Sequence, residues 1–71
     1  MSAIWESSEH GKYDAYLYIE DDGSLILSVG EYHKDRYETY RFLTNQRGFD
    51  DAAELADILN NWVKTYKKEI K

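Results

Sequence analysis

The chain has 71 residues, a formal net charge of −5 and no cysteine, and these three properties exclude several classes of protein. A chain of this length holds one small hydrophobic core, so multidomain enzyme architectures are excluded. Without cysteine the chain forms neither a disulfide nor a thiolate zinc site, which is typical of proteins in reducing compartments. The 14 acidic residues outnumber the 9 basic ones, so we do not expect direct binding to nucleic-acid phosphates.

The first predicted elements form an antiparallel β-meander over residues 13–44. Residues 13–20 alternate between apolar and polar positions, as expected of a strand with one apolar face. The sequence DDGS follows, and Asp-Gly supplies the positive-φ residues of a tight turn. Alternation resumes at Leu25 and predicts a second strand to about Tyr32. Residues 37–44 are rich in β-branched and aromatic side chains and predict a third strand.

A helix is predicted over residues 51–68. Asp51 and Glu54 have the spacing of a capping box. Five large apolar side chains recur at helical spacing and form one stripe: Leu55, Ile58, Leu59, Trp62 and Tyr66. The helix dipole explains the charges near both predicted ends, which belong to Asp50, Asp51, Glu54, Lys64, Lys67 and Lys68.

These elements predict an α+β fold of two layers, a three-stranded antiparallel β-meander packed on one C-terminal helix (βββα) in a single domain spanning residues 1–71. The role of residues 1–12 is open, with a short edge strand around Ile4 and Trp5 as one option. The helix is expected to cover the sheet face formed by Leu17, Ile19, Leu25, Leu27, Val29, Tyr40 and Phe42. Alternation places the remaining side chains on an uncovered face: Asp14, Tyr16, Tyr18, Glu20, Ile26, Ser28, Tyr37, Thr39 and Arg41.

The uncovered face is aromatic and acidic, which favours binding to another protein. The chain has seven tyrosines, more than one helix can cover, and tyrosine suits interfaces because it combines rigid contact area with a hydroxyl group. The acids at the predicted turn would steer a basic partner towards this surface. The predicted partner-binding residues are Tyr16, Tyr18, Glu20, Asp21, Asp22, Ile26 and Tyr37.

Two alternative interpretations of these residues stay open. In the first, the tyrosines pack against one another on a solvated face, and the acids serve only turn formation and helix capping. Alternatively, the uncovered face closes a homodimer. A third alternative, a nucleic-acid-binding module, would use the basic residues Lys34, Arg36, Arg41 and Arg47.

Catalytic and metal-binding patterns are not evident in the sequence. His10 and His33 are the only histidines, and neither has a second ligand at the spacing of a metal site. No serine lies in a nucleophile-elbow motif, and the DDG sequence lacks the alternating ligands of a calcium loop. We therefore expect no enzymatic activity, no cofactor and no metal.

The organisation of the chain resembles that of the small phage-encoded anti-CRISPR inhibitors. The resemblance covers most of the chain: a small acidic protein without cysteine, the strand-turn-strand YIEDDGSLIL, and a last strand leading through Phe49, Asp50 and Asp51 into the helix AAELADILNNW. It implies a non-catalytic stoichiometric inhibitor that binds a CRISPR effector, often at a nucleic-acid-binding surface. These inhibitors share no motif, so the resemblance assigns no functional residues.

Taken together, the residues and the resemblance predict a non-catalytic acidic protein-binding module that inhibits a nucleic-acid-processing or CRISPR-type defence complex. The same exposed aromatic and acidic side chains would also suit two alternatives: a homodimeric structural or adaptor protein, or a toxin-neutralising immunity protein or antitoxin. The chain has no apolar run of about 18 residues and no basic leader at its start. We therefore expect no membrane association and a cytoplasmic location, in the host cell if the protein is phage-encoded.

Overall fold

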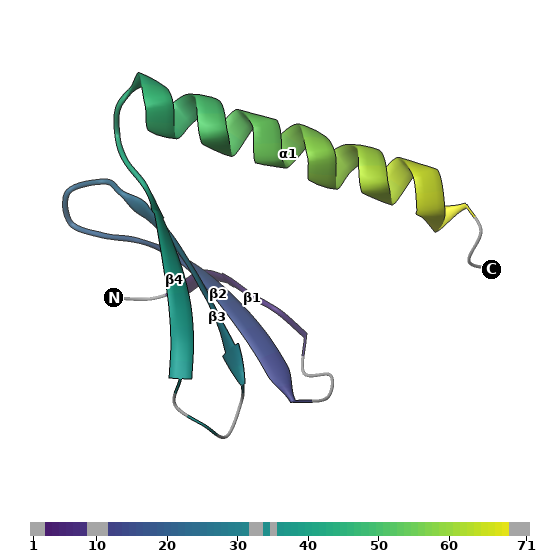
Figure 1. Cartoon of the computed structure of the whole chain (residues 1–71), viewed down its shortest axis with the longest axis horizontal. Helices are drawn as coiled ribbons and strands as arrows, with labels where there is room; N and C mark the ends of the chain where they lie inside the picture. The colour runs from purple at the N-terminus through teal and green to yellow at the C-terminus, as the bar shows by residue number, and fades with distance from the viewer. Residues whose placement is uncertain (1–2, 9–11, 32–33, 35, 69–71) are drawn as a thin grey trace.

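The chain folds into one four-stranded sheet and one long helix. A computed structural model of the chain describes residues 3–8, 12–31, 34 and 36–68. The elements are β1 (Ala3–Glu6), β2 (Tyr13–Ile19), β3 (Leu25–Glu31), β4 (Arg36–Phe42) and α1 (Gln46–Lys67). The strands are antiparallel in the order β1-β2-β3-β4, and α1 leaves the end of β4 and runs beside the sheet (Figure 1). The α+β class is confirmed, whereas the prediction of three strands is wrong.

The fourth strand is β1, at the edge of the sheet, in the segment whose role the sequence left open. It pairs with β2, and the register shifts between Ala3 and Trp5. A strand of four residues with such a bulge does not show clean alternation of apolar and polar residues, so its pattern was too short to identify. Trp5 lies opposite Leu17, which places the indole on the sheet face that looks towards α1. Tyr32, His10 and His33, which the sequence analysis discussed, fall outside the described residues.

The turn between β2 and β3 forms as predicted from the Asp-Gly pair. Gly23 has a φ of 91°, a conformation that favours glycine, and its N–H donates to the Glu20 carbonyl at 2.8 Å. The Ser24 N–H donates to Oδ1 of Asp22 at 2.8 Å. Because this hydrogen bond favours the charged carboxylate, it lowers the pKa of Asp22. The turn therefore uses one of its acids as a structural acceptor.

The helix begins at Gln46 and not at Asp51, so the predicted capping box is wrong. Asn45 is the N-cap, and its side-chain oxygen accepts a hydrogen bond from the Gly48 N–H at 2.9 Å. Gly48 is buried, and a Cβ atom there would lie 1.9 Å from the Leu43 carbonyl oxygen. Glycine thus allows the first turn to lie against the end of β4, although sequence patterns alone indicated a helix breaker.

This earlier start removes the dipole explanation for the acidic residues near the predicted helix start. No acidic residue lies in the first turn of α1, and the dipole effect falls off within that turn. Asp50, Asp51 and Glu54 therefore lie too far along the helix to be explained in this way. The basic end is as predicted, with Lys64 and Lys67 in the last turn.

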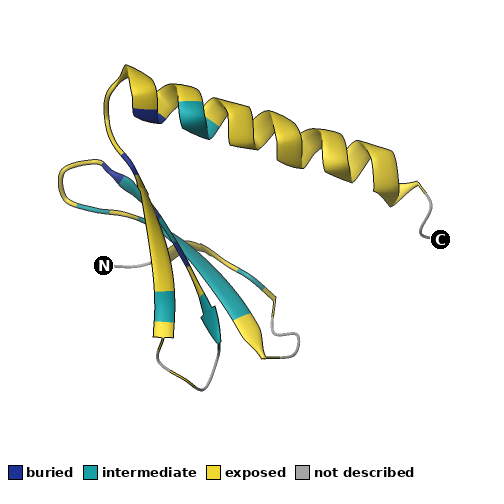
Figure 2. Ribbon diagram, viewed as in Figure 1, coloured by how far each residue is buried: buried dark blue, intermediate teal, exposed yellow. Residues whose placement is uncertain are grey.

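The core is small because α1 diverges from the sheet. Among the described strands α1 contacts only β4, and most of its length is exposed (Figure 2). The helix was expected to cover one face of the sheet, but it does so only near its own start, where Phe42 is 8% exposed. Ile19, Val29 and Tyr40 on the same sheet face remain exposed. The most buried large apolar residue is Ile26, at 3% exposure, on the opposite face.

Candidate protein-interaction surfaces

The tyrosine face is the side of the sheet that points away from α1. The strand register confirms the predicted alternation, because Ile26 lies between Tyr18 of β2 and Arg41 of β4. The same rows place side chains of three strands on one face, and we call this set the tyrosine face: Asp14, Tyr16, Tyr18, Ile26, Ser28, Tyr37, Thr39 and Arg41.

One corner of the tyrosine face is a hydrogen-bonded cluster. The hydroxyls of Tyr16 and Tyr37 both donate to Oδ2 of Asp14, at 3.2 and 3.5 Å, and their rings meet edge to face with centroids 5.7 Å apart. The Tyr37 ring packs over Gly30, where a Cβ atom would lie 2.8 Å from the ring. Partial burial, together with the hydrogen bonds to Tyr16 and Asp14, raises the pKa of the Tyr37 phenol above its ordinary value. These side chains therefore hold one another in place.

The end of the tyrosine face nearest the β2–β3 turn is covered by an ion pair. Arg41 of β4 pairs with Glu20, which follows β2, and its guanidinium also lies 4.0 Å from Asp22. The pair spans β3 at the level where Ser24 and Ile26 are 1% and 3% exposed. Ile26 thus lies on the predicted face but supports it from beneath, whereas Tyr16, Tyr18 and Tyr37 are half-buried.

Two acidic clusters that are distant in the sequence lie at the same end of the molecule. The β2–β3 turn and the start of α1 lie at the same end of the sheet in Figure 1, and a Cβ on Gly23 would lie 3.1 Å from the methyl group of Thr44, in the connection between β4 and α1. We call this region the acidic end, and its carboxylates are Glu20, Asp21, Asp22, Asp50 and Asp51. Arg41 and Arg47 are the basic residues beside them. The excess of carboxylates gives this end a negative field that attracts a basic surface.

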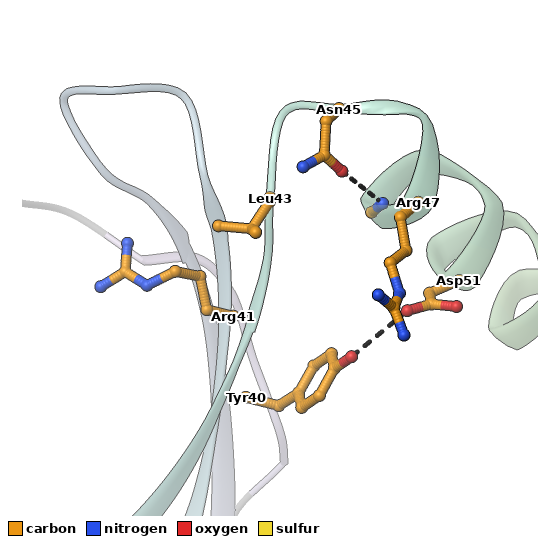
Figure 3. A pocket seen from close by; sticks show the side chains of 7 residues that line it. Tyr40, Arg41, Leu43, Asn45, Arg47 and Asp51 are labelled. Carbon is orange, nitrogen blue, oxygen red and sulfur yellow. Dashed lines mark hydrogen bonds between the residues drawn. The ribbon is translucent and has the colours of Figure 1, made fainter.

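A pocket of about 310 Å³ lies between β4 and the start of α1 (Figure 3). Its lining includes Tyr40 and Arg41 from β4 and Arg47 and Asp51 from α1. The Tyr40 hydroxyl donates to Oδ2 of Asp51 at 3.3 Å and ties the second turn of the helix to the sheet. This bond is exposed, so it is worth little by itself and leaves the helix held mainly at its start.

Beyond this anchor the sheet and the helix form an open apolar groove. A space of about 460 Å³ is lined by Leu27, Tyr40 and Phe42 of the sheet and by Leu55 and Ile58 of α1, with Asp51 and Glu54 at its edge. The apolar side chains continue along the helix past the groove, and we call them the helix stripe: Leu55, Ile58, Leu59, Trp62, Val63 and Tyr66. Each member is between 37% and 64% exposed. Isolated exposed apolar residues are ordinary, but a continuous row of six marks an interaction site.

Sequence reasoning found the helix stripe but assigned it to the core. The observed lengths explain the error: 22 residues of α-helix span about 33 Å, whereas a seven-residue strand spans about 23 Å. The predicted helix of residues 51–68 and the predicted strands of eight residues would both span about 27 Å. The predicted lengths therefore gave no sign of an overhanging apolar row.

The basic residues considered for nucleic-acid binding do not gather into one patch. Lys34 and Arg36 lie in and after the β3–β4 connection, at the end of the sheet remote from Arg47. Arg41 is paired with Glu20. This dispersion gives no continuous track for a phosphate backbone.

Comparison of the chain with protein-family models, with curated proteins and with solved structures finds no match. In the described part of the chain, no helix combines the length and the apolar character needed to cross a membrane.

Proposed function

We propose that this protein is a non-catalytic protein-binding module that inhibits a nucleic-acid-processing complex, such as a CRISPR-type effector, by occupying a basic surface. The observation that carries this proposal is the acidic end. The fold brings the β2–β3 turn and the start of α1, both rich in carboxylates, to the same end of the molecule. An end rich in carboxylates beside exposed apolar and aromatic groups complements a surface that normally binds phosphates.

The loss of the dipole explanation strengthens this interpretation. Asp50 and Asp51 do not cap α1, because Asn45 does so, and they lie beyond the first turn. Asp51 accepts a hydrogen bond from the Tyr40 hydroxyl at 3.3 Å, and Asp50 accepts one from the Gln46 side chain of its own helix at 2.8 Å. In the turn, Asp22 accepts from Ser24. Asp21 and Asp50 are exposed, and replacing them should disturb the fold least, so they are the residues to alter.

The test compares two charge-altered variants in a capture experiment from bacterial lysate. D21K/D50K reverses two charges at the acidic end. E6K/E38K reverses two charges elsewhere, on exposed positions of β1 and β4, and is the matched control. We expect wild type and the control to retain one basic nucleic-acid-binding complex, and D21K/D50K to lose it. The purified complex should also lose nucleic-acid binding as wild-type protein is added to equimolar amounts.

Equal capture by all three proteins would overturn the assignment to the acidic end. Capture without loss of nucleic-acid binding would overturn inhibition while leaving a binding module. A Y18A variant, which shortens a half-buried side chain of the tyrosine face, shows whether that face adds to the contact. A loss of about 2 kcal/mol or more would be typical of an aromatic hot spot.

A further inference from the structure

With the helix stripe and the groove uncovered, the chain exposes a far larger surface than a compact chain of this size does. The chain exposes 6310 Å², whereas a compact monomer of 8.4 kDa exposes about 4,600 Å². The radius of gyration is 14.1 Å, against about 11 Å for a compact domain of this length. Both values show that the fold is extended, and the helix stripe is an exposed apolar row within it that lacks a covering layer.

The excess area is large enough to supply the interface of a stable dimer. The difference of about 1,700 Å² per chain is about twice the roughly 800 Å² that each partner buries in a standard interface. It lies within the range of roughly 1,000 to 2,500 Å² per chain found in obligate homodimers, whose interfaces resemble a divided core. A small docking peptide would leave much of this surface open.

The charges along α1 indicate what kind of chain fits against the stripe. The first half of the helix carries Asp50, Asp51, Glu54 and Asp57 with no lysine or arginine among residues 50–63, and its end carries Lys64, Lys67 and Lys68. An antiparallel copy of α1 therefore sets an acidic half beside a basic half. A parallel copy would set like charges side by side, which is unfavourable.

The stripe is also complementary to itself in the antiparallel direction. Its midpoint lies between Asn60 and Asn61. An antiparallel pair centred there brings Leu59 of one copy level with Trp62 of the other, and Ile58 level with Val63. The same register brings Glu54 within one residue of the level of Lys68, on the same flank of the stripe. One alignment thus satisfies both the apolar row and the charges, as a two-fold symmetric interface requires.

We propose that two copies of this chain form a symmetric dimer in which the α1 helices pack antiparallel through the helix stripe. This inference does not depend on the acidic end, which lies at the start of α1 and remains available in the dimer. It relocates the homodimer considered from the sequence, which would have used the tyrosine face.

The test measures the mass of the full chain by analytical ultracentrifugation across a concentration series. Wild type is expected at twice the 8.4 kDa chain mass at about 100 µM. Trp62 is 62% exposed in the single chain, so W62K should fold but raise the dimer dissociation constant about 30-fold or more. N61K adds the same charge one residue away and off the stripe, and it should behave as wild type.

Charge reversal tests the antiparallel direction. K67E/K68E makes the end of the helix acidic, and E54K/D57K makes its first half more basic while changing the net charge only from −5 to −1, since each replacement adds two. Each variant alone should dissociate at concentrations where wild type is dimeric, and an equimolar mixture should recover dimer mass. General repulsion does not explain dissociation of E54K/D57K, because its net charge is closer to zero.

Three results would overturn the proposal. A monomer mass for wild type at about 100 µM would mean that another occupant, or the chain's own sheet, covers the stripe. A dimer unaffected by W62K would place the interface on another surface, such as the tyrosine face. Charge variants that dimerise as well as wild type would contradict the antiparallel arrangement.

Discussion

The two faces of the sheet differ in how completely their side chains are buried and paired within the chain. On the tyrosine face, the Arg41–Glu20 ion pair spans β3 and Ile26 is 3% exposed beneath it. On the face towards α1, Val29 and Tyr40 are exposed although both point towards the helix. A face rich in polar groups has become the better-packed one, because tyrosine hydroxyls and charged groups found partners within the sheet. Apolar side chains need a second layer, and α1 supplies it only at its first turns.

This contrast shows that the apolar pattern of the sequence identifies the side chains that could form a core, but not which of them are buried in the fold. The alternation in β2 and β3 correctly separated the two faces. It identified the face towards α1 but did not show how much of that face would be covered, because cover depends on the angle at which α1 leaves β4. That angle is fixed by the contact between Gly48 and the backbone of Leu43, a close approach that leaves no trace in hydrophobic periodicity.

The largest difference between the faces should emerge from matched isoleucine substitutions. Ile26→Ala removes a buried side chain and should lower the free energy of unfolding by about 3 kcal/mol. Ile58→Ala alters a side chain that is 64% exposed, so its cost should arise only from association and should vanish on dilution. Urea denaturation at two protein concentrations separates these effects.

The milder Ile26→Val keeps this comparison valid if Ile26→Ala does not fold, with an expected loss of about 1 kcal/mol. Equal losses at positions 26 and 58 that do not depend on concentration would mean that α1 covers its own sheet in solution.

Gly48→Ala should disturb the anchor that sets the angle of the helix. Alanine inside a helix normally stabilises it by about 1 kcal/mol relative to glycine. Here a Cβ would meet the Leu43 carbonyl oxygen at 1.9 Å, so the first turn must move away from β4. We expect a net loss of about 2 kcal/mol in the thermal or urea transition. An increase in stability would show that the helix start does not lie against β4.

The smallest effect concerns the phenols of the tyrosine face. Because Tyr37 holds its proton more strongly in the fold, ionisation in the unfolded chain occurs first as the pH rises. The contribution of Tyr37 is therefore constant below pH of about 10 and decreases above it. An ultraviolet titration should show one tyrosine ionising after the others, and Y37F should remove that late step. Simultaneous ionisation of all tyrosines would contradict the cluster.

Several features could be predicted because they depend on neighbouring residues. The DDGS turn, the alternation of β2 and β3, and the basic end of α1 are local, and each is found in the structure. The start of α1 was missed because Asn45 was available as a cap while Gly48 and the run of acids favoured a later beginning. The fourth strand was missed because β1 has four residues and a bulge.

The candidate binding residues were predictable only as a set on one face. Tyr16, Tyr18, Ile26 and Tyr37 do share a face. Their mutual packing, and the proximity of the turn acids to Asp50 and Asp51, depend on contacts between distant segments. The exposed helix stripe likewise required the angle of α1, and its overhang depends on a helix start that the sequence pattern placed too late.

The most direct test of the account follows the fluorescence of Trp62 as the protein is diluted. The chain has two tryptophans, Trp5 and Trp62, so a W5F variant reports on the helix stripe alone. The account predicts a blue-shifted emission at high concentration that moves to the emission of a solvent-exposed indole on dilution. Adding E54K/D57K in the W5F background should abolish the blue shift. A blue-shifted emission that persists at every concentration would show that Trp62 is buried within its own chain, and a solvent-exposed emission throughout would show that the stripe has no partner copy.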